Sequence, residues 1–239
     1  MQSRAVLTTI CKPIVRVLDR PGGRKLLGGL ASSYVRATGS SASLRFDKGY
    51  WIRICGDGSV CMDLPYFWYS PRVLAELDKY PRQSRAAARE HWFHLYRPSP
   101  GDVVVDVGAG VGWDTLEFSH AVGPSGRVIA IEAHPTTFNR LQRMCELNGL
   151  DNVECWHFAA FDRKGSVSIQ DGSNDLANRV CTSGGGVLDV EARTLDDVLC
   201  DVLKIETIAL LKMNIEVAEV AALAGSDRPL SRTLFSAIA

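Results

Sequence analysis

A glycine-rich turn after an apolar run is the part of this 239-residue sequence best suited to chemistry. The run VVVDVGAGVG (103–112) continues an apolar segment into Asp106, Gly108, Ala109 and Gly110. Glycine lets the backbone turn sharply and lets a ligand approach without meeting a Cβ atom. A helix that begins here presents unpaired N–H groups. The run therefore predicts a ligand site at the carboxyl end of a parallel strand.

The spacing of these glycines indicates which ligand to expect. The pattern is Asp-x-Gly-x-Gly-x-Gly, which differs from the Gly-x-Gly-x-x-Gly that cradles a pyrophosphate. This difference favours S-adenosylmethionine over NAD, because S-adenosylmethionine has no pyrophosphate. Glu132 follows the next apolar run, and its two oxygens suit the two hydroxyls of a ribose. The alternatives are a tight turn without a ligand, and an acid that caps the helix starting near Pro135.

The elements that position these residues are strands alternating with helices after Gly101, a pattern typical of an α/β fold with a parallel sheet. We expect the sheet to carry helices on both faces, since its first strand is continuously apolar. The expected strands are 103–107, 127–132, 153–158, 166–170 and 208–215, and the expected helices are 113–120 and 135–148. Thr182–Gly186 is expected to form a glycine-rich loop.

With these motifs the sequence resembles the FkbM-type family of S-adenosylmethionine-dependent methyltransferases. The resemblance runs over residues 90–225, through GDVVVDVGAGVGWDTLEF, GRVIAIEAHP, LNGLDNV, AAFDRKGSVSI, RTLDDVL and LLKMNIEVAE. It implies a class I methyltransferase (Rossmann-like) fold, S-adenosyl-L-methionine as cofactor, and methylation of a hydroxyl on a sugar, polyketide or related metabolite. It also implies cofactor contacts at Asp106, Gly108, Gly110 and Glu132, with the segment from Ala160 to Asp162 beside the adenine.

The sequence departs from this family pattern near its C-terminal end. Asn214 stands where the family usually has Asp, and Val217 where it usually has Gly. Asn214 can donate and accept hydrogen bonds but carries no charge. The catalytic residue stays unassigned, with Asn214 and Glu216 as the candidates, and no metal ligand is predicted. Residues 232–239 can supply at most a fifth strand, so the sheet is expected to be truncated. A non-catalytic remnant that only binds the cofactor is therefore the alternative function.

Residues 1–98 are expected to form an accessory segment, and residues 99–239 the methyltransferase-like domain. Within the accessory segment, 50–64 predicts a hairpin that turns at Gly56–Ser59. A helix follows, whose inner face carries Ala88, Trp92, Leu95 and Tyr96, and Pro98 marks its end. The aromatic residues of 66–69 and 92–96 are interpreted as packing between the segment and the domain; the alternative is a wall for stacking a substrate.

Charge and cysteine content limit which partners and which cellular compartment can be expected. Lys plus Arg and Asp plus Glu both total 27, which gives no indication of nucleic-acid binding. Residues 1–36 nevertheless hold seven basic residues and one acid; this arm is interpreted as solvated, and the alternatives are weak contact with an anionic membrane surface or a transit peptide. The seven cysteines lack metal-ligand spacing and indicate reduced core thiols in a cytoplasmic protein, and a disulfide between Cys55 and Cys61 is not expected. The acceptor is expected to be a small molecule or a glycan; its identity and the oligomeric state stay open.

Overall fold

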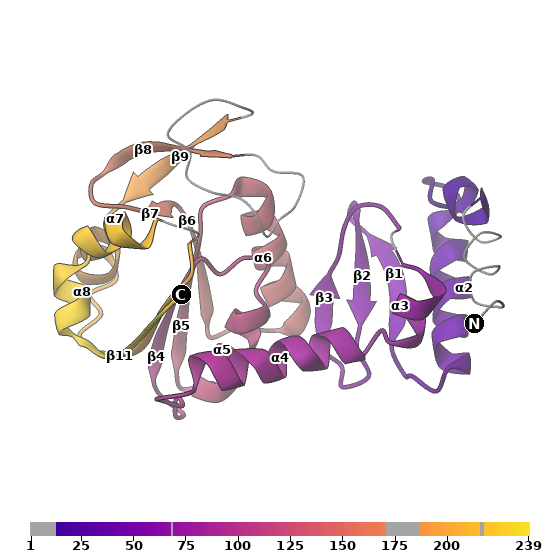
Figure 1. Ribbon diagram of the computed structural model, residues 1–239, viewed down its shortest axis with the longest axis horizontal. Helices are drawn as coiled ribbons and strands as arrows, with labels where there is room; N and C mark the ends of the chain where they lie inside the picture. The colour runs from indigo at the N-terminus through magenta and orange to yellow at the C-terminus, as the bar shows by residue number, and fades with distance from the viewer. Residues whose placement is uncertain (1–12, 68, 171–186, 216–217) are drawn as a thin grey trace. The chain divides into compact units, whose positions relative to one another are not determined.

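The computed structural model describes residues 13–67, 69–170, 187–215 and 218–239. The chain divides into two compact units, Met1–Ser84 and Arg85–Ala239 (Figure 1). Helix α4 (Lys79–Trp92) begins in the first unit and ends in the second. The expected domain boundary at residue 98 stays a proposal. No helix in the described part of the chain is both long and apolar enough to cross a membrane.

The first unit contains a three-stranded antiparallel sheet in the order β1 (Ser43–Asp47), β2 (Tyr50–Ile54), β3 (Val60–Met62). Strands β2 and β3 pair antiparallel and their turn has a positive φ at Gly58, so the hairpin predicted over 50–64 is present. Helix α2 (Arg24–Ala37) packs on this sheet, and the short helix α3 (Pro71–Ala75) joins the same core.

The two hairpin cysteines face each other, a point that the sequence left open. The Sγ atoms of Cys55 and Cys61 lie 3.7 Å apart, and both residues are buried free thiols. Cys61 lies in β3, whereas Cys55 follows β2, where its N–H donates to the carbonyl of Ser59. The hairpin turn therefore brings the side chains together even though their sequence positions flank the turn unevenly.

The second unit contains a five-stranded parallel sheet in the order β11-β10-β4-β5-β6. Its strands are β4 (Val103–Val107), β5 (Arg127–Glu132), β6 (Val153–His157), β10 (Ile208–Met213) and β11 (Thr233–Ile238). Chain order reverses between β4 and β10, and ligands of open α/β sheets bind at such a reversal, outside the carboxyl ends of the strands. Residues 233–238 thus form a fifth parallel strand.

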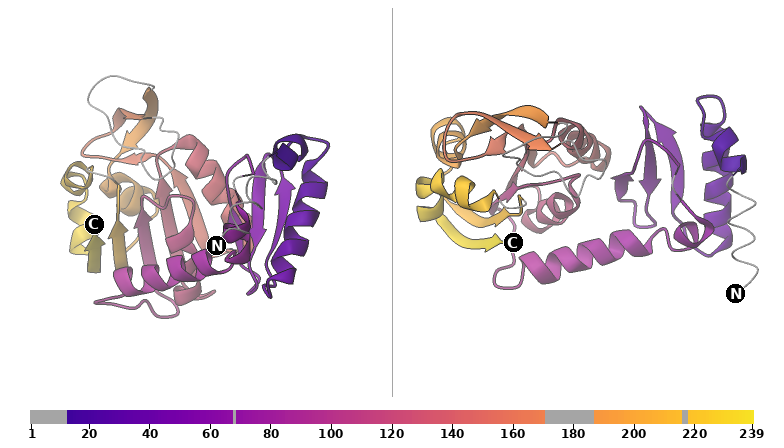
Figure 2. Two further views of the ribbon diagram at one scale, coloured as in Figure 1. Left: turned by 45° about the vertical axis from the view of Figure 1, so that its right-hand side comes forward. Right: turned by 45° about the horizontal axis from the view of Figure 1, so that its top comes forward.

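Helices cover both faces of this sheet, as expected (Figure 2). On one face, Val104, Val128 and Leu210 pack against α4 and α5 (Trp113–Val122). The opposite face of the same strands, with Val105, packs against the π-helical segment η1 (Asp196–Val202), α7 (Glu219–Ala224) and α8 (Asp227–Ser231). Alternate residues of a strand point to opposite faces, so these apolar strands are buried on both sides.

Helix α6 (Pro135–Asn148) illustrates how local signals set the elements of this unit. Pro135 occupies its first turn, where the missing N–H costs nothing, and Gly149 ends it in the left-handed conformation. Beyond α6, a small sheet β7-β9-β8 consists of β7 (Ala159–Ala160), β8 (Gly165–Gln170) and β9 (Val187–Arg193). Strand β9 was not expected from the sequence. Thr182–Gly186 lie outside the described residues.

The inner face predicted for α4 is partly wrong. Ala88 and Trp92 are buried in the core of the second unit, but Leu95 is 79% exposed because the helix ends at Trp92. Phe93 instead packs against Phe118 of α5, and Tyr96 stacks on Phe235 of β11. In the first unit, Phe67 and Tyr69 pack into the core around Trp51, whereas Tyr66 is exposed. The aromatic residues of 92–96 thus pack against the domain, as interpreted from the sequence, whereas Phe67 and Tyr69 pack within the segment, and Trp68 lies outside the described residues.

Candidate functional site

The glycine turn after β4 lies at the carboxyl end of the parallel sheet, as the sequence predicts. Gly108 and Gly110 have φ angles of +76° and +58°, in the region that favours glycine. The N–H groups of Gly108 and Ala109 both donate to the carbonyl of Ile131, at 2.9 and 3.0 Å. The turn is therefore fixed to the end of β5 before α5 begins at Trp113.

The surroundings of Gly108 and Gly110 differ in the space that they leave for a side chain. A Cβ atom on Gly108 would lie 2.1 Å from the backbone oxygen of Asn214, so the close approach of the chain after β10 requires glycine there. A Cβ atom on Gly110 would have no neighbour within 4 Å. The space above Gly110 is thus open, and it is the part of the turn that a ligand can approach.

Glu132 lies beside this open space at the end of β5. Its Oε2 atom accepts a hydrogen bond from the N–H of Gly110 at 2.9 Å, and its Oε1 atom accepts one from the N–H of His134 at 2.8 Å. Each carboxylate oxygen has two lone pairs, so each can accept one further hydrogen bond. We propose that the two hydroxyls of a ribose would supply these bonds.

Burial raises the pKa of the Glu132 carboxyl above its ordinary value, against the opposing effect of the hydrogen bonds from His134 and Gly110. Two N–H donors therefore compensate only part of the cost of removing the charge from water. Further donors, such as ribose hydroxyls, would stabilise the charged form and lower this pKa.

Beneath the turn lies a buried ion pair between neighbouring strands. Asp106 of β4 and Lys212 of β10 are direct partners in the strand register, and their Oδ1 and Nζ atoms are 2.8 Å apart. The hydroxyl of Thr115 donates to the other oxygen of Asp106 at 2.6 Å. Asp106 is 0% exposed and Lys212 is 1% exposed. The Asp106 carboxylate thus lies under the glycine turn. We propose that it affects the cofactor indirectly, through the turn that it supports.

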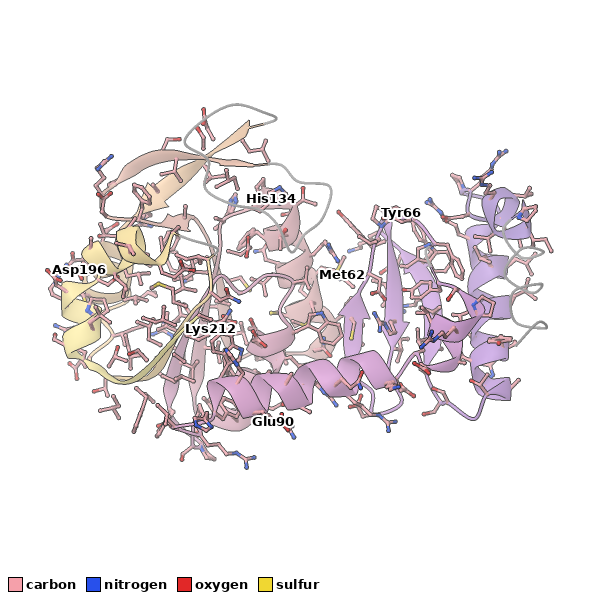
Figure 3. All side chains as sticks on the ribbon, in the orientation of Figure 1. Met62, Tyr66, Glu90, His134, Asp196 and Lys212 are labelled. Atoms are coloured by element: carbon pink, nitrogen blue, oxygen red, sulfur yellow. The ribbon has the colours of Figure 1, made fainter. Side chains whose placement is uncertain are left out.

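Lys212 is the site residue that the sequence analysis missed. Figure 3 labels its side chain on the second unit. Its Nζ atom also donates to the carbonyl of Gly108 at 2.8 Å and lies 3.7 Å from Oδ2 of Asp114 in α5. The ring of Trp92 lies 5.3 Å from the same ammonium group, within cation–π range. Burial raises the pKa of Asp114, while Lys212 lowers it. A single lysine inside the apolar strand IALLKM was the available signal.

The other residues predicted for the site have fewer described contacts with the glycine turn. Ala109 and Ala160 are both buried, and β7, which contains Ala160, lies beside β5. The predicted contact of Ala160 with the adenine stays a prediction. Asn214 is exposed at the end of β10, and its N–H donates to the carbonyl of Val107 at 3.0 Å. Glu216 and Val217 lie outside the described residues.

The residues present fit an adenosyl cofactor. Two features support this fit: the open space above Gly110, which a Cβ atom would enter, and the adjacent carboxylate of Glu132. Strands β4 and β5 are paired neighbours, which keeps these two features together. The Asp106–Lys212 pair leaves no net charge beneath the turn.

We expect Gly110→Ala to abolish binding of S-adenosylhomocysteine while leaving the protein folded, because the methyl group enters the open space. The left-handed conformation alone costs a non-glycine residue about 1–2 kcal/mol. Gly149→Ala is a matched control, since Gly149 has a φ of +62° and equally no neighbour within 4 Å of a Cβ, but lies at the end of α6. Calorimetry and thermal unfolding of both variants would test this. Equal loss of binding in both would refute the location of the site.

Comparison with known proteins gives one family match. The model of the methyltransferase FkbM domain matches residues 106–238. The 2-O-methyltransferase NoeI of Sinorhizobium fredii is 26% identical over 182 residues, which cover 69% of this chain and 72% of that protein. An arsenite methyltransferase of Halobacterium salinarum is 34% identical over 56 residues, covering 23% of this chain and 14% of that protein. A solved structure, methyltransferase FkbM from Methylobacillus flagellatus, is 20% identical with a TM-score of 0.44, covering 67% of this chain and 41% of that one.

Proposed function

Since the chain belongs to the FkbM family of S-adenosylmethionine-dependent methyltransferases, we propose that it methylates a hydroxyl group of a small-molecule or glycan-like acceptor, such as a sugar or a polyketide. The observation that carries the proposal is the open space above Gly110 with Glu132 fixed beside it. The resemblance to a protein named as a 2-O-methyltransferase supports oxygen as the atom that is methylated.

We assign Glu132 the ribose hydroxyls, and the backbone of Gly108–Gly110 the part of the cofactor nearest the turn. Glu132 is held in place by the N–H groups of Gly110 and His134, so its oxygens are already oriented before the cofactor arrives. Lys212 holds the carbonyl of Gly108 from below. Such preorganisation limits the ordering that binding would otherwise require.

The bound cofactor supplies a methyl group on a sulfonium. The chain's contribution is to hold the acceptor hydroxyl in line with that methyl group, at about 3–3.5 Å, and to exclude water. Held by the Gly108–Gly110 turn and Glu132, the cofactor would supply this methyl group to the hydroxyl oxygen and leave as the neutral thioether, and the hydroxyl proton would pass to a base or to water. Asn214 lies at the rim of the turn and can hydrogen-bond the hydroxyl, but a neutral amide does not take up its proton. Glu216 remains the candidate base.

A binding module without transferase activity is the competing function, favoured by the neutral Asn214 at the end of β10. The two are separated by supplying S-adenosylmethionine with a labelled methyl group and an extract of hydroxyl-bearing metabolites. We expect label to enter an ether linkage with wild-type protein and with Gly149→Ala, but not with Gly110→Ala. Binding of S-adenosylhomocysteine without any transfer would support the binding module and overturn the proposed reaction.

A further inference from the structure

The outer face of α2 carries a stripe of exposed apolar side chains. Leu26, Leu30 and Tyr34 are 58%, 52% and 38% exposed. They recur every four residues, so they lie one above another on one face of the helix. The adjacent stripe, about 100° around the helix, already packs on the sheet of the first unit through Leu27, Ala31 and Val35. Helix α2 therefore has two apolar stripes. One packs within the unit, and the other is exposed.

The helical turn before α2 carries two further exposed apolar side chains. Residues 13–18 are helical, and within them Ile14 and Val17 are 52% and 64% exposed. Exposed large aliphatic residues are ordinary when they are scattered singly. Four of them and one tyrosine lie within the stretch 14–34, which is a concentration and not a scatter.

The same stretch is strongly basic. Arg16, Arg20, Lys25 and Arg36 are exposed. The one acid in residues 13–37 is Asp19, and its Oδ1 atom already accepts from Arg24 at 2.8 Å. The exposed cations pair with no carboxylate in the part of the chain that the structure describes. The apolar stripe is therefore bordered by uncompensated positive charge.

We propose that this α2 surface, defined by Ile14, Val17, Leu26, Leu30 and Tyr34 with the bordering basic residues, docks on an anionic lipid bilayer. A helix with aliphatic residues on one face and Lys or Arg beside them lies in the plane of the interface, with its apolar side chains among the acyl chains. Long basic side chains reach from there to the headgroups, and a tyrosine suits the boundary between the two. The described residues contain no membrane-spanning helix, so the contact is peripheral.

Charge distinguishes this partner from the others that an apolar stripe could bind. A second copy of the chain would bring the same positive charges together, which is unfavourable. A nucleic acid would pair with the basic residues but would leave the leucines in water. An anionic bilayer satisfies both features. This proposal does not depend on the proposed methyl transfer.

Co-sedimentation of the full chain with vesicles tests the proposal. We expect binding to vesicles of phosphatidylcholine mixed with phosphatidylserine, little binding to phosphatidylcholine alone, and loss of binding at high salt. Lys25→Glu/Arg36→Glu is expected to lower the partition coefficient by at least about 5-fold for each basic residue that is replaced. Leu26→Ser/Leu30→Ser is expected to lower it about tenfold, through the lost apolar burial.

The matched control is Leu95→Ser/Leu234→Ser, because these leucines are 79% and 62% exposed and lie outside the α2 surface. This variant should bind as the wild type does, and circular dichroism should show all variants equally folded. The proposal is overturned if neutral vesicles bind equally, if the control loses binding to the same extent, or if sedimentation velocity shows a dimer that Leu26→Ser/Leu30→Ser dissociates.

Discussion

Replacing Glu132 with alanine is expected to weaken the binding of S-adenosylhomocysteine by about 10²–10⁴-fold. The estimate follows from two hydrogen bonds to a charged acceptor, each worth about 1.5–3 kcal/mol. Glu132→Gln keeps a single neutral acceptor oxygen and should give an intermediate loss. Isothermal titration calorimetry of the three proteins measures the effect.

The same site predicts a pH dependence. Burial raises the pKa of Glu132 above its value in the unfolded chain, so in the absence of ligand this group favours the folded state at pH values below its unfolded pKa. That stabilisation is lost as the pH rises through the folded pKa. We propose that the ligand binds the charged carboxylate more tightly than the protonated form, so affinity should instead fall on acidification, beginning above the ordinary range of a glutamate. Glu132→Gln should remove this part of the pH dependence.

Glu154→Ala is the control for the Glu132 variants. Glu154 lies on β6, next to β5, and forms an ion pair with Arg127 at 2.5 Å, away from the glycine turn. Calorimetry should find ligand affinity unchanged in this variant. If Glu132→Ala bound the ligand as tightly as Glu154→Ala does, the assignment of the ribose to Glu132 would be wrong.

Replacing Lys212 with methionine is expected to lower the free energy of unfolding by about 3–5 kcal/mol, because it leaves the Asp106 carboxylate buried without its counter-charge. The loss should appear in urea denaturation as a lower midpoint with an unchanged slope. Lys164→Met is the matched control: Lys164 is exposed, and such surface changes stay within about 0.5 kcal/mol.

The double variant Asp106→Asn/Lys212→Met separates the charge effect from lost packing. Asparagine can still accept the hydrogen bond from Thr115 but carries no charge. We expect the double variant to recover a large part of the stability lost in Lys212→Met. If it were instead the sum of two independent losses, the Asp106–Lys212 pair would not be the stabilising unit.

The buried Asp106–Lys212 pair also affects the position of the glycine turn. Asp106 and Lys212 are opposite each other in the register of β4 and β10, so a slip of β10 by one residue against β4 would turn Lys212 to the face of the sheet away from Asp106. Lys212 additionally ties Gly108 to β10 and approaches α5 through Asp114. We propose that this cluster sets the register at the chain reversal and thereby the position of the turn.

Local sequence patterns were enough to predict most elements of the second unit and its glycine turn. The apolar run 103–107, the glycines after it, Pro135 and Gly149 each act through the backbone of their own segment, so β4, the turn and α6 were predictable. Strand β9 carried an equally local signal, since Leu188, Val190 and Ala192 alternate with charged residues, and the sequence analysis overlooked it. The glycine spacing and Glu132 likewise indicated the cofactor.

The tertiary structure alone decided what each polar side chain does. Asp106 follows an apolar run just as Glu132 does, but the register of β10 places Lys212 against Asp106 and buries it, while Glu132 ends its strand beside open space. Gly108 and Gly110 look alike in the sequence, and only the path of the chain after β10 distinguishes them. The physical reason is that burial and ion pairing depend on residues about 100 positions apart in the chain, as Asp106 and Lys212 are, whose meeting a local pattern does not encode.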